Sequence, residues 1–104
     1  MVNIRESDMI RKIRFLEWRK AELVVAAGEV MRAVALGVRA PMADALSRVV
    51  VACYVLGRHL GIGFDGLDEA VSRRLEGPLG IEEQEIEDRC GDYRALRRYR
   101  RLKE

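Results

Sequence analysis

Apolar residues recur three and four positions apart through two long segments, residues 11–37 and 41–61, and this spacing predicts two long helices. A single polar residue, Lys20, interrupts one such row, which comprises Ile13, Leu16, Leu23, Ala27, Val30 and Val34. A second apolar row runs along the same segment through Val24, Val25, Ala26 and Met31. A helix that is apolar on nearly every side must be buried on nearly every side. We therefore expect the two helices to pack against each other and against further copies of the chain.

The ends of these helices carry recognisable signals. Ser7 is a candidate N-cap for the first helix, and Gly37 is a candidate stop. Pro41 suits the start of the second helix, which Gly61 would end. Asp65 would then cap a short third helix over residues 66–75.

The C-terminal part of the chain changes charge at Gly91. Residues 82–88 are mostly acidic, whereas residues 94–103 are mostly basic and carry an apolar residue about every third position. This pattern predicts a short amphipathic helix beginning at Asp92. Its cations suit nucleic-acid phosphates, and the candidate contacts are Arg94, Arg97, Arg98 and Arg101. The acidic stretch would compete for the same charges, so we favour a helix that folds back or docks on a neighbouring subunit over a nucleic-acid partner.

Size and composition fit one soluble helical domain. The chain has 104 residues, of which 49% are hydrophobic and 35% charged, with a net charge of +2. We divide this single domain into a helical core, residues 1–78, and a C-terminal helical tail, residues 79–104. Cys53 and Cys90 lack neighbours at zinc-ligand spacing. No signal peptide or membrane span is expected, so the expected location is the cytoplasm and no membrane partner is predicted.

Three segments resemble the MazG-like, all-α nucleoside triphosphate pyrophosphohydrolases. The two motif helices of that family are matched by residues 23–34, which contain the pair Gly28-Glu29, and by residues 45–62. The short helix that follows them is matched by residues 64–71. The resemblance covers roughly residues 16–75. The opening Ile-Arg-Phe-Leu-Glu-Trp-Arg-Lys-Ala-Glu-Leu resembles more closely a small bacterial branch of MazG-like proteins. The resemblance implies an all-α fold built from a helical hairpin and short helices. Because the long helices are apolar on a second face, we expect the hairpins to assemble into a four-helix bundle, as a homodimer or homotetramer.

The resemblance also implies a Mg²⁺ site that this chain has largely lost. In the active family, Glu-Glu-x-x-Glu on the first motif helix and Glu-x-x-Asp on the second bind Mg²⁺, which prefers carboxylate oxygens. The corresponding positions here are Val25, Ala26, Glu29, Ala45 and Arg48. One acid of five is present, and a cation stands at a ligand position.

Other residues leave alternatives open. Glu22, Glu29 and Asp44 would form an incomplete Mg²⁺ site if the protein is active; otherwise, Glu29 pairs with Arg48 across the helix interface. Trp18 is a packing residue, or it lines a nucleotide cleft together with Arg48. His59 is interpreted as a plain helix-end residue.

The sequence favours a catalytically degenerate relative of the pyrophosphohydrolases, acting as an oligomeric nucleotide-binding or regulatory module. The first alternative is an active Mg²⁺-dependent nucleotide pyrophosphohydrolase. The second is a nucleic-acid-binding module that uses the basic tail.

Overall fold

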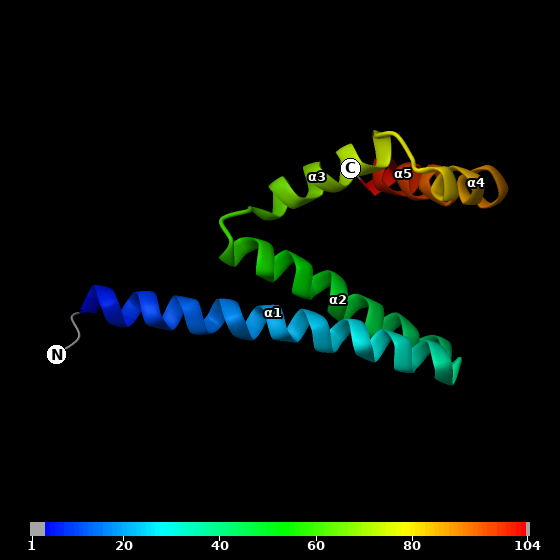
Figure 1. Ribbon diagram of the computed structural model, residues 1–104. Helices are drawn as coiled ribbons and strands as arrows, with labels where there is room; N and C mark the ends of the chain where they lie inside the picture. The colour runs from blue at the N-terminus through cyan, green and yellow to red at the C-terminus, as the bar shows by residue number, and fades with distance from the viewer. Residues whose placement is uncertain (1–3, 104) are drawn as a thin grey trace. The chain divides into compact units, whose positions relative to one another are not determined.

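The computed structural model describes residues 4–103, which form five helices and no strand (Figure 1). The helices are α1 (Ile4–Leu36), α2 (Arg39–His59), α3 (Phe64–Glu76), α4 (Ile81–Cys90) and α5 (Asp92–Lys103). The all-α prediction is therefore confirmed. The chain divides into two compact units between Phe64 and Asp65, whereas the sequence-based division falls after residue 78. Each unit is described by itself.

In the first unit, α1 and α2 form a helical hairpin (Figure 1). The buried side chains of this hairpin are small: Ala26, Val30 and Ala33 on α1, and Ala45 and Ala52 on α2. Val30, Ala33 and Ala45 form one cluster, and Met42 and Val49 pack against it. Small side chains at this contact let the axes of α1 and α2 approach closely.

Backbone geometry accounts for the ends of the hairpin helices. Gly37 adopts a φ of 72°, and its N–H donates to the carbonyl of Ala33 (3.2 Å), which ends α1 as predicted. The prediction of Ser7 as N-cap is wrong, because α1 is already helical from Ile4. Gly57 is buried beneath the turn that follows α2, and the Ile62 N–H donates to the Gly57 carbonyl at 2.8 Å.

Many large apolar side chains of the hairpin face outward. Val24 is 73% exposed, and most of the second apolar row of α1 is exposed with it. By length and composition alone α2 would pass as a membrane-crossing helix, although a helix from the core of a soluble protein passes the same test. Arg48 in the middle of α2 would be costly in a bilayer. Exposed apolar faces of this extent are typical of surfaces that other molecules cover.

The second unit is held together mainly by polar contacts to α5. Gly91, with a φ of 68°, separates α4 from α5, as the change of charge predicts. The guanidinium groups of α5 bond back to α3: Arg97 donates to the Leu75 carbonyl (2.7 Å), and Arg100 donates to Ser72 Oγ (2.9 Å) and the Asp68 carbonyl (3.0 Å). The basic tail therefore folds back on its own unit, which is one of the two arrangements favoured from the sequence.

Candidate functional site

The hairpin contact occupies the place where the family resemblance puts a metal ion. Ala26, at one expected ligand position, is 1% exposed, and Ala45, at another, packs against Val30 and Ala33. Val25, at a third position, is exposed on α1. Aliphatic side chains offer no ligand to a hard cation such as Mg²⁺. The contact between the helices is thus closed by alanine and valine instead of carboxylates.

The remaining acids near this region are dispersed. Glu29 forms an ion pair with Arg32 of its own helix (3.8 Å), so the predicted pairing with Arg48 is wrong within one chain. Glu22 pairs with Arg19 at 3.1 Å, while Asp44 is exposed on α2. Within residues 4–103 no three His, Cys, Asp or Glu side chains lie close enough together to hold a metal ion. These residues do not fit Mg²⁺ within one chain, and a site from Glu22, Glu29 and Asp44 of two chains stays a prediction.

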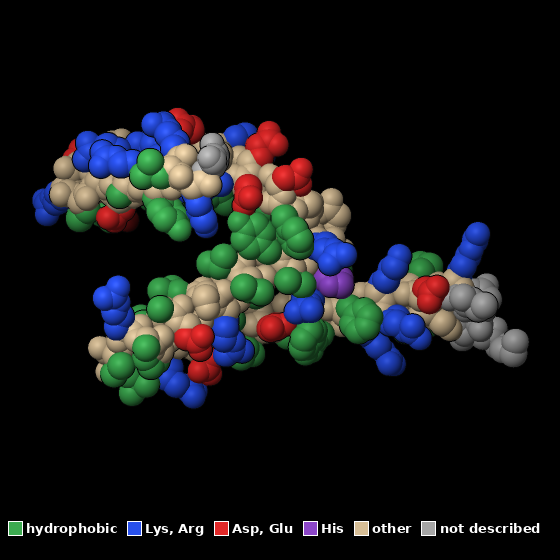
Figure 2. Space-filling view, turned by 180° about the vertical axis from the view of Figure 1, so that it is seen from behind, with side chains coloured by type: hydrophobic (Ala, Val, Ile, Leu, Met, Phe, Trp, Pro, Cys, Tyr) green, Lys and Arg blue, Asp and Glu red, His purple; other side chains and the backbone are tan. Residues whose placement is uncertain are grey.

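An open groove of about 550 Å³ lies in the hairpin where the end of α2 meets the N-terminal half of α1. Its lining residues are Arg14, Phe15, Trp18 and Arg19 from α1 and His59 from the last turn of α2. Trp18 is 57% exposed and Phe15 is 50% exposed, so about half of each residue's surface is open to solvent or to a ligand. Tyr54 differs, because its ring meets the Phe64 ring edge-on with centroids 5.9 Å apart. Figure 2 shows the single histidine, in purple, at the surface beside basic side chains.

Two contacts fix the cationic side of this groove. The Arg19 guanidinium lies over the Trp18 ring at 4.7 Å from its centroid. Arg19 Nη1 also donates to Glu22 Oε2 at 3.1 Å, which holds the guanidinium plane in place. Only part of this five-donor group is used by these contacts. The groove therefore combines aromatic faces with guanidinium N–H groups, a set that suits an anionic aromatic ligand.

The groove agrees only in part with the predicted nucleotide cleft. Trp18 lines it, whereas Arg48 lies elsewhere on α2 and is not among its lining residues, so a nucleotide cleft that includes Arg48 stays a prediction. Sequence reasoning missed Arg14, Arg19 and His59. The sequence does carry a signal for the two arginines. Arg14 and Trp18 are four residues apart on one helix, as are Phe15 and Arg19, and side chains at this spacing lie on the same face. The position of His59 depends on where α2 ends along α1.

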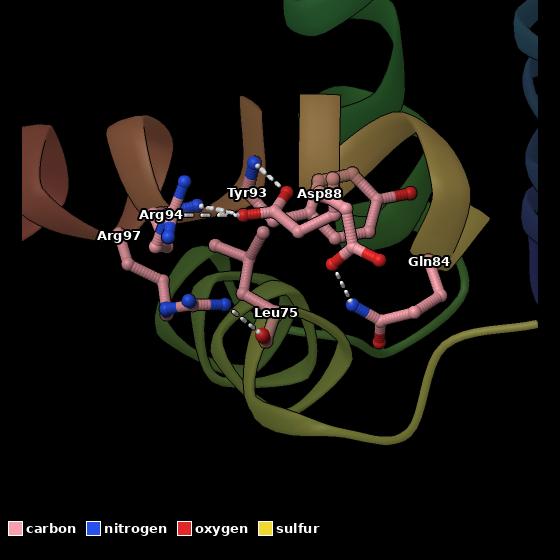
Figure 3. Close-up of polar contacts among 7 residues, drawn as sticks. Leu75, Gln84, Asp88, Tyr93, Arg94 and Arg97 are labelled. Carbon is pink, nitrogen blue, oxygen red and sulfur yellow. Dashed lines mark hydrogen bonds and ion pairs between the residues drawn. The ribbon is translucent and has the colours of Figure 1, made fainter. Parts of the chain in front are cut away.

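In the second unit, two glutamates of α4 organise the polar contacts. The buried Glu87 carboxylate accepts the backbone N–H groups of Tyr93 (2.8 Å) and Arg94 (3.1 Å), and so caps α5 (Figure 3). Glu83 accepts hydrogen bonds from the Tyr93 hydroxyl (2.6 Å) and Arg74 Nη2 (2.9 Å). The bond from Tyr93 lowers the pKa of Glu83, and the same bond raises the pKa of Tyr93.

The four arginines predicted to contact nucleic acid are mostly engaged within this unit. Arg94 lies 3.6 Å from Glu87, Arg97 bonds to the Leu75 carbonyl, and Arg101 lies 3.8 Å from Glu76 (Figure 3 shows Arg94 and Arg97). Arg98 is exposed and is the one of the four without such a contact in residues 4–103. Two of the four arginines thus have a carboxylate partner within the unit, and a third is held by a backbone carbonyl. Nucleic-acid binding by this tail stays an unsupported prediction.

Comparison with known proteins identifies a family. The model of the MazG-like family matches residues 9–93, which is most of the chain and includes parts of both units. No curated protein and no solved structure matches the chain. The matched range contains most of α1 and the whole of α2, α3 and α4. The chain belongs to the MazG-like family, and it is thereby related to the nucleoside triphosphate pyrophosphohydrolases.

Proposed function

We propose that this protein is a catalytically degenerate relative of the nucleoside triphosphate pyrophosphohydrolases, and that it acts as an oligomeric nucleotide-binding module with a regulatory role. The observation that carries the proposal is the burial of two alanines, Ala26 and Ala45, at expected ligand positions of the helical hairpin. Pyrophosphohydrolase chemistry needs a cation to neutralise the leaving group and to position the attacking water. A contact closed by alanines has neither the ligands nor the space for that ion.

The groove at Trp18 supports retention of a nucleotide. Its aromatic side chains would stack on a base, and its guanidinium groups would meet phosphates. Its volume of about 550 Å³ lies within the size range of small-molecule sites.

The outward apolar faces of α1 and α2 support self-association. Val24, Val25 and Met31 are exposed on α1, and Val50 and Val51 are exposed on α2. Pairing two hairpins into a four-helix bundle would bury such residues, and a second pairing would give a tetramer. Sedimentation of the purified chain tests this part, and a monomer at micromolar concentration would overturn it.

The catalytic part is tested by pyrophosphate release from a panel of nucleoside triphosphates with excess Mg²⁺. We expect no release above the rate without protein. Robust release that Glu29→Gln abolishes, and that the matched variant Glu17→Gln retains, would overturn the proposal in favour of an active enzyme. Glu17 is a suitable control because it is an exposed acid on the same helix, paired with Lys20 (2.9 Å).

A further inference from the structure

We infer that the groove formed by Arg14, Phe15, Trp18, Arg19 and His59 binds nucleoside polyphosphates in their Mg²⁺-free form, with the protein's own cations taking the place of the metal ion. This inference rests on the proposed function, because it specifies the ligand of the same nucleotide site. The structure supplies two separate observations for it: the absence of a carboxylate cluster in residues 4–103, and the chemistry of the groove.

The first step concerns charge. Two arginines and one histidine line the groove, and no carboxylate does. Arg19 is bonded to the Glu22 carboxylate, which lies outside the lining of the groove. A free polyphosphate is more negative than its Mg²⁺ complex, and a Coulomb attraction grows with the ligand's charge. The groove therefore favours the uncomplexed ligand, and a bound Mg²⁺ would be repelled by the same guanidinium groups.

The second step concerns geometry. Arg19 is fixed against Trp18 and Glu22 before any ligand arrives, so few rotamers are lost when its remaining N–H groups bind phosphate. Arg14 lies one turn from Trp18 on α1, and His59 comes from α2. A base stacked near Phe15 and Trp18 would thus have its phosphates within reach of the guanidinium groups of α1 and of the His59 imidazole on α2.

Another possible occupant is a second copy of the chain that covers the two rings. A nucleotide is favoured because three of the five lining side chains are basic and would pay a desolvation penalty under an apolar helix face. The alternative makes a distinct prediction for the fluorescence of Trp18, which is the chain's one tryptophan.

The experiment is a titration of the full chain with ATP, followed by Trp18 fluorescence, at constant ionic strength in EDTA and in excess Mg²⁺. We expect quenching in both, with a lower Kd in EDTA, and weaker binding of adenosine. Arg14→Gln should raise the Kd for ATP in EDTA roughly tenfold, as loss of one charge-assisted hydrogen bond does. Arg32→Gln is the matched control, because Arg32 is an exposed arginine on the same helix outside the groove, and its Kd should not change.

The outcomes separate the two proposals. A lower Kd in Mg²⁺ than in EDTA would overturn the metal-free inference and leave nucleotide binding intact. An unchanged Kd in Arg14→Gln would overturn the assignment of this groove. A blue-shifted Trp18 emission without quenching, and with no ATP binding by calorimetry, would overturn both and indicate that a second copy covers the groove.

Discussion

A glutamate introduced at position 26 would restore one acid that the active family carries, at the cost of placing it in a closed contact. Ala26 is 1% exposed between α1 and α2. An unpaired charge in such a place destabilises a protein by roughly 3–5 kcal/mol, and the larger side chain adds about 1–3 kcal/mol of overpacking. Since whole domains unfold with about 5–15 kcal/mol, Ala26→Glu should leave little folded protein. Ala21→Glu on the exposed side of α1 should change stability by less than about 0.5 kcal/mol.

Urea denaturation followed by far-ultraviolet circular dichroism measures both variants. All samples should share one protein concentration, because an oligomer's stability depends on it. The loss in Ala26→Glu should be smaller at acidic pH, where the buried carboxyl group takes up a proton. A loss below about 1 kcal/mol, or full recovery on adding Mg²⁺, would refute the reasoning, because either result means that the contact accepts a carboxylate.

Three further predictions concern other parts of the chain. Glu87→Gln should destabilise the second unit by about 1–2 kcal/mol, because a weaker acceptor then caps α5, whereas the exposed Glu85→Gln should cost less than about 0.5 kcal/mol in the same urea assay. The hydrogen bond from Tyr93 to Glu83 stabilises the fold below the usual tyrosine pKa of 10.0, and this stability is lost as pH rises through the higher pKa of the folded state. Tyr93→Phe should remove this alkaline loss from a plot of unfolding free energy against pH, and an unaltered plot would count against the bond. Val24→Glu should shift sedimentation toward monomer, and a mutant that sediments like the parent would place Val24 outside any interface.

Much of the fold could be predicted from local signals. The glycines at positions 37 and 61 adopt positive φ and lie where helices were expected to end. Gly91 also adopts positive φ and lies where the acidic stretch was expected to give way to the basic helix. Helix starts were less predictable: Ser7 looked like a cap, but the helix continues through it, because a candidate cap acts only if the preceding residues are not helical. The tail's return to α3 was one of two arrangements that its charges allowed, and the acceptors that hold Arg97 and Arg100 are largely backbone carbonyls, which no sequence pattern marks.

The candidate site was less accessible to sequence reasoning. Loss of the metal ligands is visible in the residues themselves, whereas the groove depends on the relative placement of two helices. Arg48 was expected near Glu29 because a buried charge needs a partner, but Arg48 is exposed and Glu29 pairs along its own helix. His59 was interpreted as a helix-end residue, which it is; that this helix end meets Arg14 and Trp18 is a property of the folded hairpin alone.

The unequal lengths of the hairpin helices have a consequence for how this protein can change. α1 has 33 residues and α2 has 21, a difference of 12 that corresponds to about 18 Å of helix. Substitutions in the overhanging stretch leave the alanine contact untouched, so they carry little penalty in folding. Ligand preference can thus diverge between related chains while the hairpin that supports it stays the same.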